Sequence, residues 1–209
     1  MRDELFPELN STQIHADARL FANRYDLLSS MIFAKGGVIA EIGVAAGSFS
    51  QFILEALNPE VFYALDTFGM HKYPMYWGEP SEIKFKGMTH LDFYREQFLS
   101  RGDQVKTIQG LSYETLPLFP DNFFDLIYVD AGHSYDEVRR DAWIARDKIK
   151  FNGVLIFNDY TMYDQRAGES YGVVQAVNQL IVEDGWVVTG FALHKDMFCD
   201  IAIRKPDAS

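Results

Sequence analysis

Four acidic residues stand at or near the ends of short apolar runs in this 209-residue sequence: Glu41, Asp66, Asp130 and Asp159. Each run is typical of a buried β-strand. The carboxyl ends of parallel strands meet at one edge of a sheet, so we expect the four carboxylates to share a site there. Carboxylates accept hydrogen bonds from hydroxyl and ammonium groups, hold divalent cations, and take up protons.

A short loop containing two glycines follows the first apolar run. A dinucleotide site uses G-x-G-x-x-G to bring pyrophosphate to a helix N-terminus, whereas this loop has two glycines at another spacing and begins with an acid. S-adenosylmethionine has no phosphate and carries a sulfonium cation, so the loop favours this ligand over a dinucleotide. The alternative is an ordinary turn between a strand and a helix. The loop residues that we expect to bind the cofactor are Glu41, Gly43, Ala45, Gly47 and Ser48, and Ser48 is also expected to cap the following helix.

Asp66 ends the second apolar run, about 20 residues beyond the loop, where nucleotide-binding folds place a carboxylate that accepts hydrogen bonds from ribose hydroxyls. We expect Asp66 and the adjacent Thr67 to contact the ribose. Because NAD and S-adenosylmethionine both carry a ribose, Asp66 alone does not decide between them.

Asp130 and Asp159 end two further runs, and Asn158 stands beside Asp159. Their oxygens are ligands of the kind that Mg²⁺ prefers, so the three residues form a candidate metal site. The alternative is that Asp130 positions the cofactor and that Asp159 caps a turn.

These runs alternate with amphipathic helical patterns, which predicts an α/β fold. We expect a doubly wound, Rossmann-like, mostly parallel sheet of seven strands, with a C-terminal antiparallel hairpin and helices on both faces. The predicted strands are 38–42, 61–66, 104–109, 124–130, 154–157, 186–193 and 199–203. The predicted helices are 11–34, 48–57, 91–100, 135–149 and 172–183, and Asn152-Gly153 is expected to end the helix 135–149.

The length suits one domain over residues 1–209, with an N-terminal helical segment at 1–35. Residues 68–98 are rich in aromatic side chains and longer than a simple crossover, so we interpret them as a lid-like insertion. A contact between two copies of the chain in a homodimer would bury the same aromatic residues. In the loop 161–170, Tyr163 and Arg166 are candidates for contacts with an acceptor.

The net charge of −11 repels phosphate backbones, which argues against nucleic acid as a partner. Cys199 is the single cysteine, so a disulfide framework is excluded. No apolar run is long enough to cross a membrane, and the charged start Met1-Arg2-Asp3-Glu4 is unlike a signal peptide. We therefore expect a cytoplasmic protein that acts on a small molecule.

The chain resembles class I S-adenosylmethionine-dependent methyltransferases over almost its whole length. The first motif of that family resembles Glu41-Ile42-Gly43-Val44-Ala45-Ala46-Gly47, and Asp66 is similar to its acidic ribose-binding residue. The resemblance implies that Gly110, Leu111 and Ser112 flank the adenine.

A narrower group, related to macrocin-type and catechol-type O-methyltransferases, resembles the segment Asp130-Ala131-Gly132-His133-Ser134-Tyr135. In the catechol-type enzymes an aspartate and an Asp-Asn pair hold Mg²⁺, whereas this chain has the reversed order Asn158-Asp159. A lysine three residues after the first aspartate is their base, and His133 stands at that place. The resemblance implies Asp130 and His133 as catalytic residues that also contact the cofactor. The alternatives for His133 are stacking on the adenine or capping the helix that starts at Tyr135.

The resulting hypothesis is a methyltransferase that transfers a methyl group, in line, to an oxygen of a small-molecule or sugar-like acceptor. Two alternatives stay open at this point: an NAD(P)-dependent oxidoreductase, which shares Asp66, and a non-catalytic module that keeps the fold.

Overall fold

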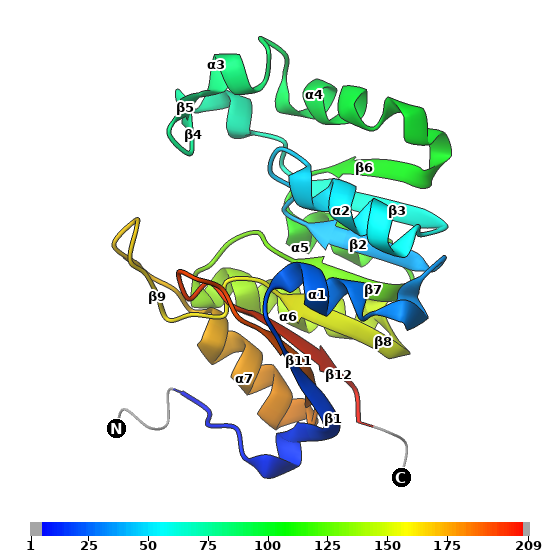
Figure 1. The fold of residues 1–209 in the computed structure, drawn as a ribbon, viewed down its shortest axis with the longest axis vertical. Helices are drawn as coiled ribbons and strands as arrows, with labels where there is room; N and C mark the ends of the chain where they lie inside the picture. Colours follow the sequence, from blue (N-terminus) through cyan, green and yellow to red (C-terminus); the bar gives the residue numbers. More distant parts are fainter. Residues whose placement is uncertain (1–5, 207–209) are drawn as a thin grey trace.

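A computed structural model describes residues 6–206. In this part of the chain, eight strands form a central sheet in the order β1-β11-β12-β8-β7-β2-β3-β6 (Figure 1). Their bounds, in sheet order, are Ile14–Phe21, Val187–Ala192, Asp200–Arg204, Ile149–Phe157, Phe124–Val129, Val38–Ile42, Val61–Asp66 and Val105–Gln109.

The strand directions confirm the expected mostly parallel sheet with a closing hairpin. Within the described sheet, β12 pairs antiparallel with both β11 and β8, and every other pair is parallel. From β2 the chain proceeds to β3 and β6 on one side, and then to β7 and β8 on the other. This reversal places the ends of β2 and β7 at the crevice where such sheets bind ligands.

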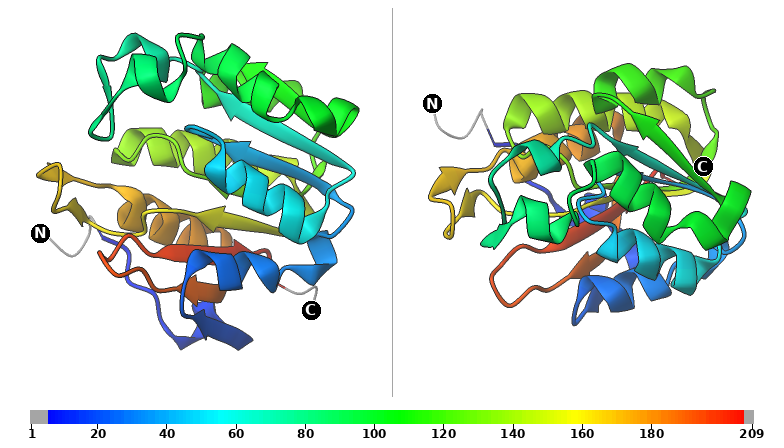
Figure 2. Two further views of the ribbon diagram at one scale, coloured as in Figure 1. Left: turned by 45° about the horizontal axis from the view of Figure 1, so that its top comes forward. Right: turned by 90° about the horizontal axis from the view of Figure 1, so that it is seen from above.

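Helices cover both faces of the sheet, as the right-hand view of Figure 2, seen from above, shows. Leu27 of α1 and Ile53 of α2 belong to a buried cluster on one face. Val138 of α6 and Leu180 of α7 belong to a second cluster on the other face. The α-helices α1 to α7 are Arg24–Ser29, Ser48–Leu57, Ser81–Lys84, His90–Gln97, Ser112–Thr115, Tyr135–Lys148 and Val173–Asp184. None of the described helices is long and apolar enough to cross a membrane.

Shorter elements complete the described chain. The 3-10 helices η2 to η6 are Ser11–Gln13, Ile32–Ala34, Met70–Lys72, Leu99–Gln104 and Leu116–Leu118. Two small hairpins pair β4 (Met75–Tyr76) with β5 (Glu79–Pro80), and β9 (Tyr163–Asp164) with β10 (Glu169–Ser170).

The predicted long helix at 11–34 is wrong. Residues 14–21 form β1, which pairs in parallel with β11 and makes the sheet eight-stranded instead of seven-stranded. Backbone pairing with a strand far along the sequence outweighs the local helical pattern here. The side chain of Asn23 then accepts a hydrogen bond from the Asp26 amide at 2.9 Å and starts the short helix α1. Residues 1–5 of the predicted helical segment lie outside the described residues.

The predicted boundary at Asn152-Gly153 is also wrong. The helix α6 ends at Lys148, and β8 runs directly on from Ile149 through both residues to Phe157. The pairing of β8 with β7 shifts register between Phe124 and Leu126, so this irregularity accommodates Gly153 within the strand.

Candidate functional site

A cavity of about 1160 Å³ opens at the carboxyl ends of β2, β3, β7 and β8. Most of the predicted site residues lie on its wall. These are Gly43, Ala45, Asp66, Thr67, Gly110, Leu111, Ser112, Asp130, His133, Asn158 and Asp159. Glu41, Gly47 and Ser48 do not lie on it. The sheet therefore gathers residues from five separated segments at one edge.

Gly43 is required by the protein's own backbone. Its φ is 82°, and a Cβ atom there would lie 2.0 Å from the carbonyl oxygen of Asp130. The Gly43 amide donates to Leu65 O at 2.9 Å, and the Asp130 amide donates to Ile42 O at 2.8 Å. The loop that leaves β7 thus comes close to the backbone at Gly43, and Gly43 also lines the cavity.

Glu41, in β2, is buried and is hydrogen-bonded to the helix α2. Its side chain is only 1% exposed, and its Oε2 accepts a hydrogen bond from Ser50 Oγ at 2.5 Å. Burial raises the pKa of the Glu41 carboxyl to about 8, because water no longer stabilises its charged form. Ser48 is exposed, and the predicted cap at this residue is wrong: Gly47, with a φ of 80°, is the N-cap of α2.

Asp66 is held with its carboxylate facing two backbone amides. Its Oδ2 accepts from the Val44 amide at 2.8 Å, and its Oδ1 accepts from the Phe68 amide at 2.6 Å. Thr67 Oγ1 also donates to Oδ1, at 3.4 Å, so the acceptor site that remains for a ribose hydroxyl is on Oδ2.

Asp141 on α6 is a cavity residue that sequence reasoning missed. It is 3% exposed, and it accepts a hydrogen bond from Ser112 Oγ at 2.5 Å. Burial raises the pKa of its carboxyl to about 6. The sequence does contain an indication of this residue. Asp141 is a charged residue on the otherwise apolar buried face of α6, which also includes Val138, Ala142 and Ala145.

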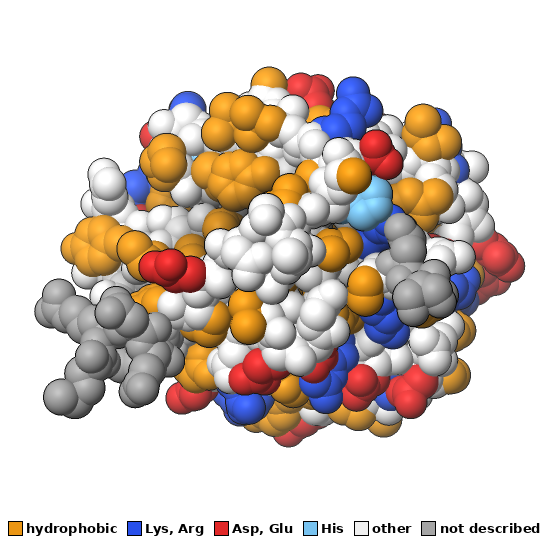
Figure 3. Space-filling model, turned by 90° about the horizontal axis from the view of Figure 1, so that it is seen from below, with side chains coloured by type: hydrophobic (Ala, Val, Ile, Leu, Met, Phe, Trp, Pro, Cys, Tyr) orange, Lys and Arg blue, Asp and Glu red, His pale blue; other side chains and the backbone are white. Residues whose placement is uncertain are grey.

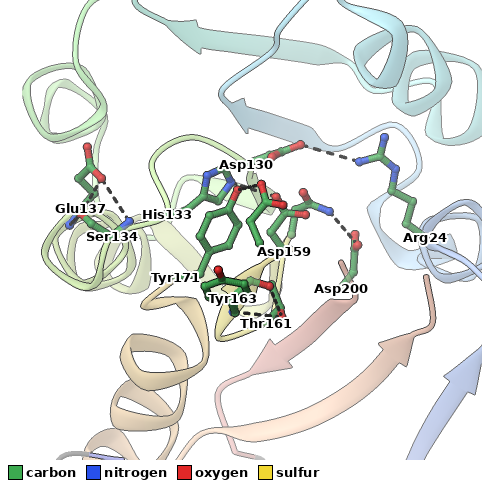
Figure 4. Close-up of polar contacts among 12 residues, drawn as sticks. Arg24, Asp130, His133, Ser134, Glu137, Asp159, Thr161, Tyr163, Tyr171 and Asp200 are labelled. Atoms are coloured by element: carbon green, nitrogen blue, oxygen red, sulfur yellow. Dashed lines mark hydrogen bonds and ion pairs between the residues drawn. The ribbon is translucent and has the colours of Figure 1, made fainter. Parts of the chain in front are cut away.

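Asp130, His133 and Asp159 form a cluster at the ends of β7 and β8 (Figure 4). One ligand atom from each residue lies within 4.8 Å of the other two. His133 Nε2 lies 3.1 Å from Asp159 Oδ2, and the His133 ring stacks on Tyr171 at 4.4 Å between centroids. The ring of His133 is therefore fixed by a carboxylate and by an aromatic face.

Burial and neighbouring charges shift the pKa values of Asp130 and His133. Burial, and then the charge of Asp159, raise the pKa of Asp130 to about 7, while Arg24 and His133 act against this. Burial lowers the pKa of His133, but the neighbouring carboxylates of Asp159, Asp130 and Glu137 together outweigh burial, so the net shift of this pKa is upward.

The Asn158 amide nitrogen is directed toward Asp200 of β12, donating to Asp200 Oδ1 at 2.9 Å. Tyr128 donates to the other oxygen of Asp200 at 2.6 Å, and Arg24 Nη1 lies 3.4 Å from the Tyr128 hydroxyl. Arg24 also lines the cavity, and sequence reasoning missed it because it lay within the wrongly predicted helix.

The aromatic insertion 68–98 has a packed base and an exposed rim. Tyr76 Oη accepts from the Ala46 amide at 3.2 Å, and the fully buried His90 donates through Nε2 to Ala45 O at 2.5 Å. Trp77 is 78% exposed, and it lines the cavity together with Tyr73. The base of the insertion thus fixes the glycine loop, and the rim forms part of the cavity wall.

Two segments from the C-terminal part of the sequence form another part of the cavity wall. The hairpin β9–β10 contributes Arg166, and the loop between β11 and β12 contributes Phe198. Arg166 pairs with Asp196 and lies over the Phe198 ring at 5.4 Å. Of the two predicted acceptor contacts in 161–170, Arg166 lines the cavity and Tyr163 does not.

Comparison with known proteins agrees with this geometry. A family model described as a methyltransferase domain matches residues 40–160, more than half of the chain. No curated protein matches the sequence.

Solved structures share the fold at low identity. The cofactor-bound structure of Rv0187 from MTB has a TM-score of 0.62 at 17% identity, covering 94% of this chain and 86% of that one. Precorrin-6y C5,15-methyltransferase from Geobacter metallireducens GS-15 has a TM-score of 0.59 at 16% identity, covering 87% of each chain. An O-methyltransferase family protein from Burkholderia thailandensis has a TM-score of 0.60 at 14% identity, covering 89% of this chain and 56% of that one.

The chain belongs to this methyltransferase-domain family and is a class I S-adenosylmethionine-dependent methyltransferase. The oxidoreductase and the non-catalytic module are set aside by this membership, and the two-glycine loop fits the same conclusion.

Proposed function

We propose that this enzyme methylates a hydroxyl oxygen of a small-molecule or sugar-like acceptor. The observation that carries the proposal is the fixed pair His133–Asp159, which lies on the cavity wall beside Asp130. A hydroxyl must lose its proton when it is methylated, and an imidazole oriented by a carboxylate is suited to take it. A structural neighbour described as an O-methyltransferase family protein adds support.

The reaction is an in-line displacement at the methyl carbon. A lone pair of the acceptor oxygen forms the new C–O bond, the C–S bond breaks, and its electrons remain on sulfur as the neutral thioether of S-adenosylhomocysteine. Since Nε2 of His133 faces the Asp159 carboxylate, the hydroxyl proton passes to the other ring nitrogen, Nδ1, and the charge of Asp159 stabilises the imidazolium that forms. The protein must also align the two reactants and exclude water.

A divalent cation fits the same edge. Asp130 and Asp159 present carboxylate oxygens close enough to share one ion, and Mg²⁺ commonly takes one or two carboxylates and completes its shell with water or substrate. Asp130 and Asp159 would hold it, with Asn158 adjacent, and the ion would lower the pKa of a bound acceptor hydroxyl.

The walls indicate the shape of the acceptor. Trp77 and Tyr73 on one rim, with Phe198 on the other, offer flat apolar faces to a sugar or an aromatic ring. Tyr73 and Trp77 belong to the insertion 68–98, and Phe198 belongs to the loop between β11 and β12.

The test uses methyl-labelled S-adenosylmethionine and a panel of acceptors in matched pairs that carry a hydroxyl or an amine at the same position. We expect label on oxygen, identified by the NMR shift of the methyl carbon. The variant His133→Gln should lose turnover and keep its affinity for S-adenosylhomocysteine. Label found on nitrogen or carbon, with none on oxygen, would overturn the proposal.

A further inference from the structure

Tyr171 lies against the face of His133 at the cavity wall. The centroids of the two rings are 4.4 Å apart and the ring planes are 5° from parallel, and Figure 4 shows the two side chains next to each other. Both residues line the cavity. The contact joins two distant segments, because His133 follows β7 whereas Tyr171 stands between β10 and α7.

The hairpin β9–β10 holds the Tyr171 ring in place. The Tyr171 hydroxyl donates to Asp164 Oδ2 at 3.1 Å, and Asp164 is only 9% exposed. Asp164 Oδ1 accepts from the amides of Arg166 at 2.7 Å and Ala167 at 3.1 Å, in the turn of the hairpin. The Tyr171 amide donates to Met162 O at 2.9 Å. The phenol is therefore anchored both through its hydroxyl and through its backbone.

The backbone after Tyr171 packs on the loop that bears His133. The Gly172 amide donates to His133 O at 2.8 Å. A Cβ atom at Gly172 would lie 2.2 Å from the amide nitrogen of Tyr135, so a side chain does not fit there. A backbone hydrogen bond and a close packing contact thus accompany the stacked rings, and together they keep Tyr171 beside His133.

Asp159 and Tyr171 constrain the His133 ring in different ways. Asp159 Oδ2 lies 3.1 Å from Nε2, so it determines which ring nitrogen faces the carboxylate. A contact at one ring atom still allows the ring to tilt about that atom. The parallel face of Tyr171 restricts this tilt, because tilting would break the stacked contact. A misplacement of about 1 Å can cost about 100-fold in rate, so this restriction bears on catalysis.

We propose that Tyr171 is a positioning residue that sets the plane of the His133 ring, and that Asp164 holds Tyr171 in place for this task. The inference rests on the proposed function, in which His133 takes the proton of the acceptor hydroxyl. It gives the hairpin β9–β10 a second role, because the hairpin that contributes Arg166 to the cavity wall would also orient the base.

The first test detects the ring contact by NMR and needs no acceptor. In protein that carries isotope-labelled histidine, the face of Tyr171 should shift the His133 ring signals, which are assigned with His133→Gln. Tyr171→Leu should remove this shift, whereas Tyr171→Phe, which retains a ring, should keep most of it. The matched control is Tyr163→Leu, in the same hairpin at a residue that does not line the cavity, and it should leave the signals in place. His133 signals that do not move in Tyr171→Leu would overturn the inference.

The second test measures steady-state turnover with a hydroxyl acceptor from the panel described above. Tyr171→Leu should lower kcat about 10- to 100-fold and leave the KM for the acceptor unchanged. Its affinity for S-adenosylhomocysteine should also stay unchanged, which shows that the variant is folded. Tyr171→Phe should keep most of the turnover. In a His133→Gln background, Tyr171→Leu should lower kcat no further, because the side chain that it positions is absent.

The remaining outcomes contradict the inference in distinct ways. A raised KM with unchanged kcat in Tyr171→Leu would overturn it and make Tyr171 an acceptor contact. An equal loss of kcat in both backgrounds would also overturn it and assign Tyr171 a structural role that is independent of His133. Failure of the proposed function gives a different result: His133→Gln would then turn over as fast as the unchanged protein, while the NMR shift would still report whether Tyr171 fixes the ring.

Discussion

Asp66 shows how a single residue couples the backbone to a ligand. Its two carboxylate oxygens accept from Val44 and Phe68 amides, so the side chain is oriented before any cofactor arrives. Such preorganisation reduces the entropy lost on binding. Asp66 lines the cavity, and its negative charge strengthens any hydrogen bond that a ribose hydroxyl would donate to it.

Replacing Asp66 with Asn should therefore weaken S-adenosylhomocysteine about 10- to 100-fold, since hydrogen bonds to a charged group contribute about 1.5–3 kcal/mol. Isothermal titration calorimetry measures this directly. The matched control is Asp103→Asn, at a fully exposed carboxylate whose partner is Lys106, and its affinity should not change. An Asp66→Asn variant that binds as tightly as the unchanged protein would remove Asp66 from the ribose site.

The buried carboxyl of Glu41 leads to a prediction about how the free energy of unfolding depends on pH. The pKa of its carboxyl rises from 4.5 to about 8 on folding, so between these values the folded state retains a proton that the unfolded state releases. The free energy of unfolding then falls as pH rises through this window, by up to about 1.4 kcal/mol per pH unit.

The variant Glu41→Gln should flatten this part of the pH dependence, because an amide carries no titrating proton. Urea denaturation at a series of pH values from about 5 to 8 measures the slope. Glu60→Gln, at an exposed position, is the control and should leave the slope as it is. Identical slopes for Glu41→Gln and the unchanged protein would show that Glu41 is ionised in the folded state.

At the scale of elements, the loops after β2 and β7 are packed against each other at Gly43. Any side chain there would force the Asp130 carbonyl away and would also carry the cost of a positive φ. The site depends on this contact, because the same loop from β7 bears Asp130 and His133.

A pair of glycine variants separates these two costs. Gly36 has a φ of 70° and open space where a Cβ would stand, so Gly36→Ala should cost about 1–2 kcal/mol of unfolding free energy. Gly43→Ala should cost about 1–3 kcal/mol more, from the steric conflict, and should abolish binding of S-adenosylhomocysteine. Equal costs in urea denaturation would mean that the two loops separate easily.

Asp130 and Asp159, at the ends of β7 and β8, lead to a prediction about a divalent cation. If Asp130 and Asp159 hold a cation, removal of divalent ions with EDTA should lower turnover, and Mg²⁺ or Mn²⁺ should restore it. Steady-state kinetics after EDTA treatment provides the measurement. If turnover and acceptor affinity do not respond to EDTA or to added ions, the metal site is ruled out. His133 would then accept the proton without the help of a metal ion.

The sequence predicted the elements whose signals are local. The runs 38–42 and 61–66 match β2 and β3, because each is a continuous apolar run bounded by turn residues. Strand β1 was not predictable in the same way, since its partner β11 lies far along the chain. Asp130 and Asp159 were found because they end strands, whereas the roles of Arg24 and Tyr171 depend on tertiary contacts that no spacing reveals.

The molecule as a whole is acidic, with a net charge of −11. The face seen from below in Figure 3 carries acidic, basic and hydrophobic side chains interspersed, in a chain whose net charge is −11. Such a surface disfavours a polyanionic partner, and the functional features concentrate instead in the cavity at the sheet edge. A small-molecule acceptor is therefore the acceptor class that we propose.

We propose that the cavity at the sheet edge holds S-adenosylmethionine. Titration calorimetry of the unchanged protein with S-adenosylhomocysteine, and in parallel with NADH, tests it most directly. We predict binding of S-adenosylhomocysteine at one site per chain and no heat of binding with NADH. Binding of NADH, together with no binding of S-adenosylhomocysteine or S-adenosylmethionine, would contradict the account.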